Sequence, residues 1–296
     1  MIMTTTMYHA PVMLAEVGKF LVNNPRGFYV DGTLGGGGHS AYLLSTFPDI
    51  RVMGLDWDAE AIAEAGRNLA SYGERMQINR ENFRNIRRFL EQSHRLPVDG
   101  IVLDLGVSSH QFDRRERGFS FQSPVLDMRM DRRSEHLAVD LVNTLSEDEL
   151  ADMFFQLGEE RFSRPISRII VRERSRLRIT SGEELAALVS RVKKRRGRVH
   201  PATQVFQALR IAVNRELDNL SGFLSDLPHV LSVGGRAVII SYHSLEDRMV
   251  KQSFRKLHDD KNYMLLARKV VVPSSDEMKN NSRSRSAKLR VLERVK

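Results

Sequence analysis

A glycine-rich segment and an acidic residue beyond it are the first residues whose types and spacing predict binding chemistry. Residues 31–39 read Asp-Gly-Thr-Leu-Gly-Gly-Gly-Gly-His, and Asp56 lies 18 residues beyond Gly38. Glycines let a backbone turn tightly and approach a ligand, and a helix that begins beside them offers unbonded N–H groups. A carboxylate at the end of the next strand can accept hydrogen bonds from both ribose hydroxyls of a nucleoside. The spacing favours a nucleoside-containing ligand; a structural glycine turn with a strand-end cap at Asp56 is the alternative.

The glycines do not fit the two commonest phosphate-binding motifs. In the dinucleotide fingerprint Gly-x-Gly-x-x-Gly, Leu34 stands at the third position counted from Gly32, and Ser40 stands at the sixth position counted from Gly35. A P-loop requires Gly-Lys-Ser/Thr, which does not follow. A nicotinamide dehydrogenase and a P-loop nucleotidase are therefore disfavoured.

Basic side chains gather in the second half of the chain and indicate a polyanionic partner. The formal net charge of +9 divides into −8 for residues 1–160 and +17 for residues 161–296. Residues 191–198 hold six basic side chains and no acid. Such clusters suit phosphate backbones, although a solvated helix face is an alternative for the arginine row. Four arginines recur every fourth residue and so share one helix face, namely Arg164, Arg168, Arg172 and Arg176. A patch near the C-terminus adds Arg283, Arg285, Lys288 and Arg290.

The elements that must position these residues are repeated strand–helix units. Short β-rich runs occupy residues 28–31, 51–56 and 100–105, and residues 77–83 form a weaker candidate. Helical periodicity fills the gaps, and Asp58 is the expected N-cap of the second helix. This alternation predicts an α/β fold with a parallel sheet covered by helices on both faces. In such sheets ligands bind outside the carboxyl ends of the strands.

The sheet is expected to resume late in the chain, after a helical insertion. Residues 206–224 have the periodicity of one long amphipathic helix, residues 236–242 of a buried strand, and residues 289–295 of a half-exposed edge strand. Residues 111–198 contain no good strand and are charged and helix-like. We therefore expect one α/β domain, formed by residues 1–110 and 200–296, to be interrupted by a helical insertion at 111–199.

The composition excludes several classes of protein. The chain has no cysteine, which rules out disulfide scaffolds and cysteine-ligated metal sites, and no other metal site is expected. No apolar run approaches the roughly 20 residues of a membrane helix, and the first 15 residues lack a signal or transit pattern. A cytoplasmic protein that does not enter a membrane is expected.

Motifs along nearly the whole chain resemble the ribosomal RNA small subunit methyltransferase H family. They include His-Ala-Pro-Val-Met-Leu at 9–14, Asp-Leu-Gly-Val-Ser-Ser at 104–109 and Arg-Gly-Phe-Ser-Phe at 117–121. Beside the glycine segment, the remaining matches are residues 126–131, 158–162, 200–203, 206–211 and 241–248.

The resemblance implies a Rossmann-like class I methyltransferase that transfers a methyl group from S-adenosylmethionine to N4 of a cytosine in the decoding region of 16S rRNA. It implies that the insertion helps to recognise RNA, with 16S rRNA or the small ribosomal subunit as partner and no protein partner evident. The implied cofactor contacts are Gly37, Gly38, His39, Asp56, Phe83, Asp104 and Gln111. Together with the charge pattern, the resemblance implies that seven basic residues contact RNA, namely Arg164, Arg168, Arg172, Lys193, Lys194, Arg195 and Arg196.

Three residues at expected strand ends are candidates for surrounding the target base, namely Ser108, Ser109 and His243. An ordinary strand-end histidine is the alternative for His243. Ser244 fits a capping box with Asp247 and is expected to be structural. Two further alternatives remain for the chain as a whole: a non-enzymatic RNA-binding assembly factor on a degenerate methyltransferase fold, and a small-molecule methyltransferase.

Overall fold

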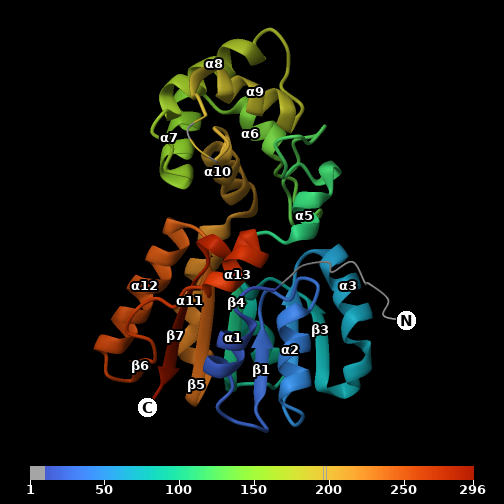
Figure 1. Ribbon diagram of the computed structural model, residues 1–296, viewed down its shortest axis with the longest axis vertical. Coiled ribbons are helices and arrows are strands. Elements are labelled where there is room, and N and C mark those ends of the chain that lie inside the picture. Colours follow the sequence, from blue (N-terminus) through green and yellow to red (C-terminus); the bar gives the residue numbers. More distant parts are fainter. Residues whose placement is uncertain (1–10, 196, 198) are drawn as a thin grey trace. The chain divides into compact units, whose positions relative to one another are not determined.

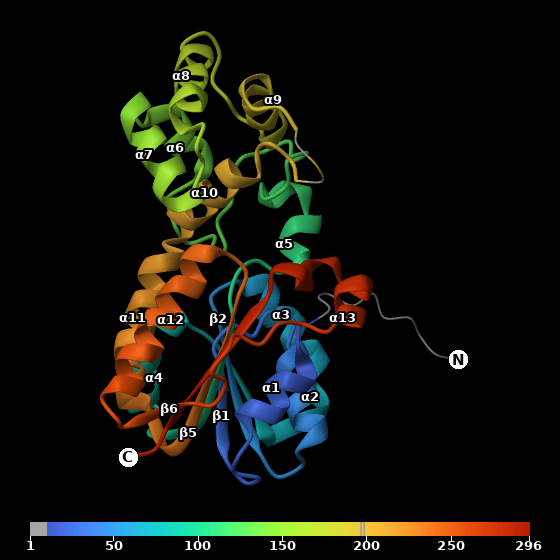
Figure 2. The same ribbon diagram turned by 60° about the vertical axis from the view of Figure 1, so that its left-hand side comes forward.

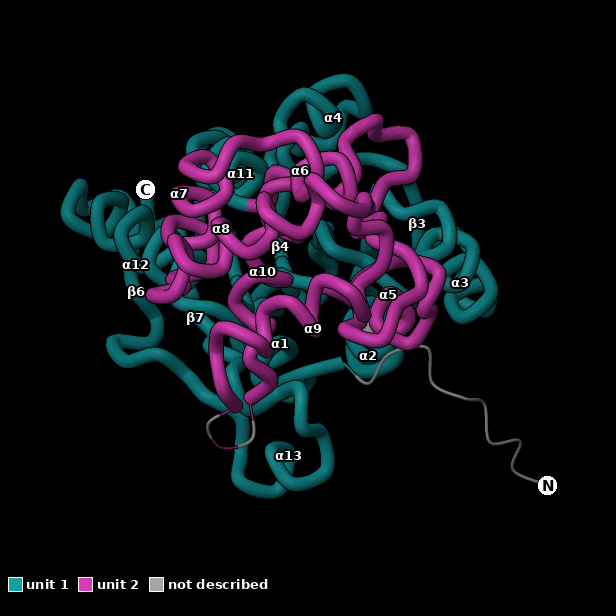
Figure 3. Tube along the Cα trace, turned by 90° about the horizontal axis from the view of Figure 1, so that it is seen from above, with its two compact units in different colours: residues 1–106, 217–296 teal, residues 107–216 magenta. Residues whose placement is uncertain are grey.

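The computed structural model describes residues 11–195, 197 and 199–296, which form two compact units (Figures 1 and 3). Unit 1 combines the chain up to Gly106 with Leu217–Lys296, and unit 2 is Val107–Glu216. His9 and Ala10 of the N-terminal motif, and Arg196 of the basic cluster, lie outside the described residues. None of the described helices combines the length and the apolar character that a membrane span requires.

Unit 1 contains a seven-stranded sheet in the order β3-β2-β1-β4-β5-β7-β6. The strands β1 to β5 are parallel, whereas β7 is antiparallel to both β5 and β6. The predicted α/β fold is confirmed, including the weaker third strand. The strands are β1 (Phe28–Asp31), β2 (Arg51–Asp56), β3 (Met76–Arg80), β4 (Val98–Asp104), β5 (Leu231–Ser241), β6 (Tyr263–Leu265) and β7 (Lys288–Arg294).

Helices cover both faces of the sheet because apolar side chains alternate along its strands. In β4, Ile101 and Leu103 pack in one core with α4, α11 and α12, while Val102 packs in another with α1 and α2. Figure 2 shows these two groups of helices on opposite sides of the strands. The helices of unit 1 are α1 (Leu14–Leu21), α2 (Gly38–Thr46), α3 (Ala59–Leu69), α4 (Ile86–Gln92), α11 (Glu216–Val230), α12 (Ser244–Asp259) and α13 (Ser275–Asn280).

Two predictions about the second half of the chain are wrong. β7 is not an edge strand, because the three-residue β6 pairs along its outer side. So short a strand leaves no alternating pattern that the sequence could reveal. The expected long helix is two helices, because Arg215 adopts the left-handed conformation with φ 51° between α10 (Thr203–Asn214) and α11. Apolar periodicity continues across this break, so the pattern alone predicts one helix.

The regular secondary structure of unit 2 is helical in its described residues. It holds α5 (Ser109–Asp113), α6 (Ala138–Thr144), α7 (Glu147–Gly158), α8 (Ser163–Arg174), α9 (Gly182–Val192) and α10. It is larger than the expected insertion at 111–199 because α10 packs tightly on α7. A Cβ atom at Gly158 would lie 2.3 Å from the carbonyl oxygen of Gln204, so only glycine permits this approach. Helix α10, which the sequence pattern joined to the sheet domain, therefore belongs to the compact helical unit.

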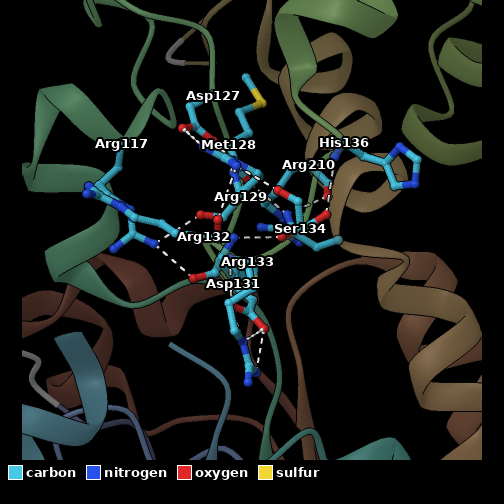
Figure 4. A network of polar contacts seen from close by, with 12 residues as sticks. Arg117, Asp127, Met128, Arg129, Asp131, Arg132, Arg133, Ser134, His136 and Arg210 are labelled. Atoms are coloured by element: carbon cyan, nitrogen blue, oxygen red, sulfur yellow. Dashed lines mark hydrogen bonds and ion pairs between the residues drawn. The ribbon is translucent and has the colours of Figure 1, made fainter. Parts of the chain in front are cut away.

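An arginine network shapes the part of unit 2 that has no regular secondary structure (Figure 4). Arg117 is 2% exposed, and its Nη2 donates to the carbonyl oxygens of Arg129 and Met130 at 3.0 and 3.1 Å. Arg129 forms a bidentate pair with Asp127 at 2.8 and 2.9 Å. Burial opposes ionisation of Asp127, but the hydrogen bonds from Arg129 prevail and lower its pKa. The motifs at 117–121 and 126–131 thus have a structural role, because side chains satisfy backbone groups that no helix or strand pairs.

Candidate cofactor site and nucleic-acid interface

The glycine segment of unit 1 is anchored at the end of β1 by Asp31. The Ser40 hydroxyl donates to Oδ2 of Asp31 at 2.8 Å, and the Thr33 amide donates to Oδ1 at 3.3 Å. Burial raises the pKa of Asp31, against the opposing effects of His39 and of the Ser40 hydrogen bond. Asp31 therefore holds the two ends of the loop together. It was not among the predicted cofactor contacts, although its place at the end of the first strand, directly before the glycines, was the available signal.

The glycines of this loop serve packing as well as any ligand. Gly37 precedes α2 with φ 85°, and a Cβ atom there would lie 2.7 Å from Leu69. A Cβ atom at Gly38 would lie 2.9 Å from Pro11. At Gly35, by contrast, the nearest atom to such a Cβ is a backbone oxygen at 4.0 Å. At Gly37 and Gly38 it is therefore the side chains of Leu69 and Pro11 that approach the backbone closely. At Gly35 no side chain of the described residues takes up this space, which is left for a ligand.

Asp56 joins the glycine loop to the end of β2. Its Oδ2 accepts from the Gly35 amide at 2.8 Å, and its Oδ1 accepts from the Asp58 amide at 2.9 Å. Asp58 in turn caps α3, as predicted, by accepting from the Glu60 amide. Burial raises the pKa of Asp56 to about 6. Each carboxylate oxygen receives one of these amides and has a second lone pair, so the group fits a ribose diol.

Asp104, at the end of β4, is held from three sides. The Tyr242 hydroxyl donates to Oδ1 of Asp104 at 2.7 Å, and the Asp104 amide donates to Oγ1 of Thr33 at 2.6 Å. Nδ1 of His39 lies 3.8 Å from Oδ2 of Asp104. His39 also contacts the Val12 carbonyl through Nε2 at 2.9 Å, which assigns a proton to Nε2. Burial raises the pKa of Asp104 to about 6 and, with the nearby carboxylate, the pKa of Tyr242. Sequence reasoning missed Tyr242, although it directly precedes His243.

Phe83 completes the part of the predicted cofactor site that unit 1 contains. It begins a short 3₁₀ helix after β3, and its Cβ lies 3.3 Å from where a Cβ of Gly32 would stand. Its ring packs edge-on against Phe223, with centroids 6.0 Å apart. Unit 1 therefore places Phe83 and the glycine segment, with Asp56 and Asp104, at the carboxyl ends of β1 to β4, where open α/β sheets bind ligands.

The predicted residues Ser108 and Gln111 form a capping box in unit 2. Oγ of Ser108 accepts from the Gln111 amide at 3.3 Å, and Oε1 of Gln111 accepts from the Ser108 amide at 3.1 Å. Ser109 is the first residue of α5, and its side chain lies outside the described residues. The capping box gives Ser108 and Gln111 a structural role. Their catalytic and cofactor roles stay predictions.

His243, not Ser244, caps helix α12. Its Nδ1 accepts from the Glu246 amide at 3.4 Å, and Oε2 of Glu246 accepts from the His243 amide at 3.4 Å. The predicted box of Ser244 and Asp247 is wrong by one residue; Asp247 instead binds Arg290 at 2.7 Å. Serine is the usual cap, and for this reason the sequence pattern pointed to Ser244. His243 is largely buried, and its Nε2 lies 3.1 Å from Oε1 of Glu246 but makes no hydrogen bond with any described residue.

The arginine row of α8 lies along acidic side chains of unit 2. Each predicted arginine contacts a carboxylate, and all of them are largely exposed. The pairs are Arg164 with Asp148 at 3.8 Å, Arg168 with Glu147 at 3.4 Å and Arg172 with Glu173 at 3.0 Å. Exposed pairs of this kind contribute at most about 1 kcal/mol, so the arginines remain able to exchange a carboxylate for a phosphate.

Lys193 has a structural partner that the sequence did not reveal. Its Nζ donates to Oε2 of Glu160 at 2.6 Å and to Oε1 of Gln204 at 2.7 Å, and Glu160 is 1% exposed. A buried carboxylate requires a compensating cation, so Lys193 is committed within unit 2. Lys194 and Arg195 beside it are exposed and remain candidates for contact with RNA.

Comparison with known proteins identifies the family. Three relatives bear the name ribosomal RNA small subunit methyltransferase H. That of Endomicrobium trichonymphae is 46% identical over 289 residues, covering 98% of this chain and 99% of the relative. That of a Cyanothece species is 48% identical over 289 residues, covering 97% and 95%. That of Coprothermobacter proteolyticus is 45% identical over 293 residues, covering 99% and 98%. The model of the MraW methylase family matches residues 6–295, and the chain belongs to this family.

Proposed function

We propose that this protein transfers a methyl group from S-adenosylmethionine to N4 of a cytosine in the decoding region of 16S rRNA. The observation that carries the proposal is the identity of 45–48%, over nearly the whole chain, with relatives named for methylation of small-subunit ribosomal RNA. The cluster of Asp56, Phe83 and Asp104 at the strand ends supports it. A substrate of this kind places the protein in the cytoplasm.

S-adenosylmethionine is the cofactor of this methylase, and the residues present fit it. When bound, it supplies an electrophilic methyl group on a sulfonium. Asp56 would hold the ribose hydroxyls with its remaining lone pairs, since each oxygen receives only one backbone amide. Phe83 and Asp104 would flank and hydrogen-bond the adenine. Alignment and exclusion of water are the main demands of such an in-line displacement.

The target base must be unstacked to reach the methyl group, and its amino group must be held. Methylation forms a bond between N4 and the methyl carbon, breaks the bond from that carbon to sulfur, and releases one proton from N4. The N4 lone pair is delocalised into the ring, so acceptors beside the amino group assist. His243 would instead orient the base: its Nδ1 accepts in the helix cap, so the ring proton lies on Nε2, which makes no hydrogen bond with any described residue and can donate one to an acceptor atom of the base.

A conservative substitution separates the two roles of His243. Asn is a good N-cap, so His243→Asn preserves the start of α12 while it removes Nε2. We expect its single-turnover methylation rate to fall about 10-fold to 100-fold, as follows from the loss of one hydrogen bond to the base worth about 1–3 kcal/mol, with thermal stability unchanged. A rate equal to that of the unaltered protein would reduce His243 to a structural cap. Ser108→Asn applies the same test to the cap of α5.

The RNA-contacting role is proposed for the exposed cations of unit 2. It rests on the exposure of Lys194, Arg195 and the arginine row of α8, whose three arginines contact only partly or fully exposed carboxylates. Lys193 is removed from this proposal because it neutralises Glu160. Arg196 remains in the proposal on its sequence position alone.

The deciding experiment incubates the protein with labelled S-adenosylmethionine and either small ribosomal subunits or naked 16S rRNA, and then maps the modified base. Label on N4 of a decoding-region cytosine is the expected result, and the better substrate shows whether the assembled particle is needed. Cofactor binding by calorimetry without transfer to either RNA would favour a small-molecule methyltransferase. Failure to bind the cofactor would favour a non-enzymatic RNA-binding factor.

A further inference from the structure

A basic pocket lies in unit 1 between α12, β7 and the segment that follows β6. Its volume is about 410 Å³, within the range of sites for small ligands and single nucleotides. Among the described residues, its lining is basic and apolar and includes no acidic side chain. The basic residues are Lys251, Arg255, Arg268, Lys269 and Arg290, and among the apolar ones are Phe254, Leu265 and Val270.

The sheet edge explains why a hollow exists at this place. Strand β6 pairs with β7 only as far as Leu265, opposite Leu292. The chain returns to β7 at an isolated bridge between Val271 and Leu289. Residues 266–270 leave the sheet between these two points, and this segment, with α12, frames the pocket. The hollow is therefore built by the strand pairing.

Most cations of this pocket have no carboxylate partner among the described residues, whereas the arginines of α8 and Lys193 in unit 2 each contact one. Arg290 is paired with Asp247 at 2.7 Å, and its side chain is 18% exposed. Lys251, Arg255, Arg268 and Lys269 have no ion pair or side-chain hydrogen bond with any described residue. All of these four except the half-buried Lys251 are exposed. Four uncompensated positive charges around an apolar floor produce a field that attracts an anion.

We propose that this pocket binds the phosphate backbone of the RNA strand, with one nucleotide seated against its apolar floor. The inference rests on the proposed function, which supplies an RNA partner. The exposed rim cations can reach successive phosphates of a polymer, and a small anion would not need all of them. Lys288 of the C-terminal basic patch adjoins the pocket, because Lys288 and the lining residue Arg290 both contact Asp247. The sheet domain would then hold RNA through its own surface, separately from the helical unit.

The test compares two double variants that each remove two positive charges. Arg255→Gln with Lys269→Gln alters the pocket. Lys256→Gln with Arg88→Gln is the control, because both of its residues are exposed, lie outside the pocket lining and have no side-chain partner among the described residues. Binding to a 16S rRNA fragment is measured by fluorescence anisotropy at several salt concentrations. The pocket variant should bind about 10-fold more weakly, and its salt slope should be smaller by about 1.4–1.8. Calorimetric affinity for S-adenosylmethionine should be the same in both.

A second measurement does not depend on substitution. Acetylation of lysines followed by mass spectrometry should show Lys251 and Lys269 protected by RNA and Lys256 unprotected. If inorganic phosphate at millimolar concentration protects the two lysines as well as RNA does, the pocket is a small-anion site and the proposal is overturned. Equal RNA affinity of the two double variants would overturn it as well.

These outcomes also separate the pocket from the proposed function. If the unaltered protein methylates 16S rRNA while both double variants bind alike, only the inference about the pocket is wrong. If RNA binds and protects Lys251 and Lys269 but is never methylated, the pocket is upheld and the proposed methylation is wrong.

Discussion

Replacing Asp104 by asparagine should stabilise the cofactor-free protein, and the gain should grow with pH. Asp104 is buried beside Asp31 and Glu246, and its pKa rises from 3.8 to about 6. A raised pKa means that the folded state binds the proton more tightly than the unfolded chain. The protonated Asp104 side chain therefore stabilises the folded state fully below pH 4. This contribution to the free energy of unfolding is lost as the pH rises through 6 and Asp104 ionises. The loss amounts to about 3 kcal/mol, since one pKa unit corresponds to about 1.4 kcal/mol.

The geometry of the site favours an amide at this position. In the Asp104→Asn variant, the side-chain amide oxygen could accept from the Tyr242 hydroxyl, as Oδ1 of Asp104 does at 2.7 Å. The amino group of the new side chain would face Nδ1 of His39, which is an acceptor in the neutral ring because the proton lies on Nε2. The substitution thus keeps the hydrogen bonds and removes the desolvated charge. It should also weaken binding of S-adenosylmethionine, because the ionised acceptor is lost.

Urea unfolding of the cofactor-free protein at pH 5, 6, 7 and 8 measures the effect. The unfolding free energy of D104N minus that of the unaltered protein should increase from pH 5 to pH 8 and approach about 3 kcal/mol. Asp49→Asn is the control for the loss of one carboxylate, because Asp49 is exposed. A D104N difference that is flat with pH, or a D104N protein less stable at pH 8, would refute the burial argument.

Three further substitutions test contacts within unit 1 or within unit 2. Gly37→Ala should lower thermal stability and calorimetric affinity for the cofactor, because Gly37 has φ 85° and a Cβ there would lie 2.7 Å from the buried Leu69. Unchanged values would show that the loop is free to shift. Lys193→Met should cost about 3 kcal/mol in chemical unfolding, because it leaves Glu160 buried without a cation, whereas Lys194→Met should cost nothing; equal effects would contradict the structural role of Lys193. Asn214→Ala removes hydrogen bonds to residues 128–130 at 2.8 Å and should cost about 2–4 kcal/mol, whereas full stability would mean that the arginine network suffices alone.

Local patterns predicted most of the sheet and the anchor points of the cofactor site. Strands β1 to β4 follow from short apolar runs bounded by glycine and acidic residues, because strand formation and turn chemistry are encoded within a few neighbouring residues. Asp56 was predicted for the same reason, since a residue that ends a parallel strand lies at the ligand-binding edge, whereas the role of Asp104 was implied by the family resemblance. The cap at Asp58 was equally local.

Contacts between distant segments escaped sequence reasoning. Asp104 and Tyr242 are 138 residues apart, and their hydrogen bond exists only because β5 pairs beside β4. Glu160 and Lys193 are 33 residues apart, so the basic cluster gave no sign that one of its members neutralises a buried acid.

The sequence by itself thus determined the α/β class, the glycine loop with its acidic partners, the concentration of positive charge after residue 160 and the family. Tertiary structure alone decided that β7 lies inside the sheet, that a single residue at 215 breaks the expected helix, and that the cations of residues 251–290 surround a hollow. The periodicity and spacing of side chains report the local structure of a few neighbouring residues. The pairing of strands, the burial of charge and the shape of a pocket depend instead on which distant segments of the chain come into contact.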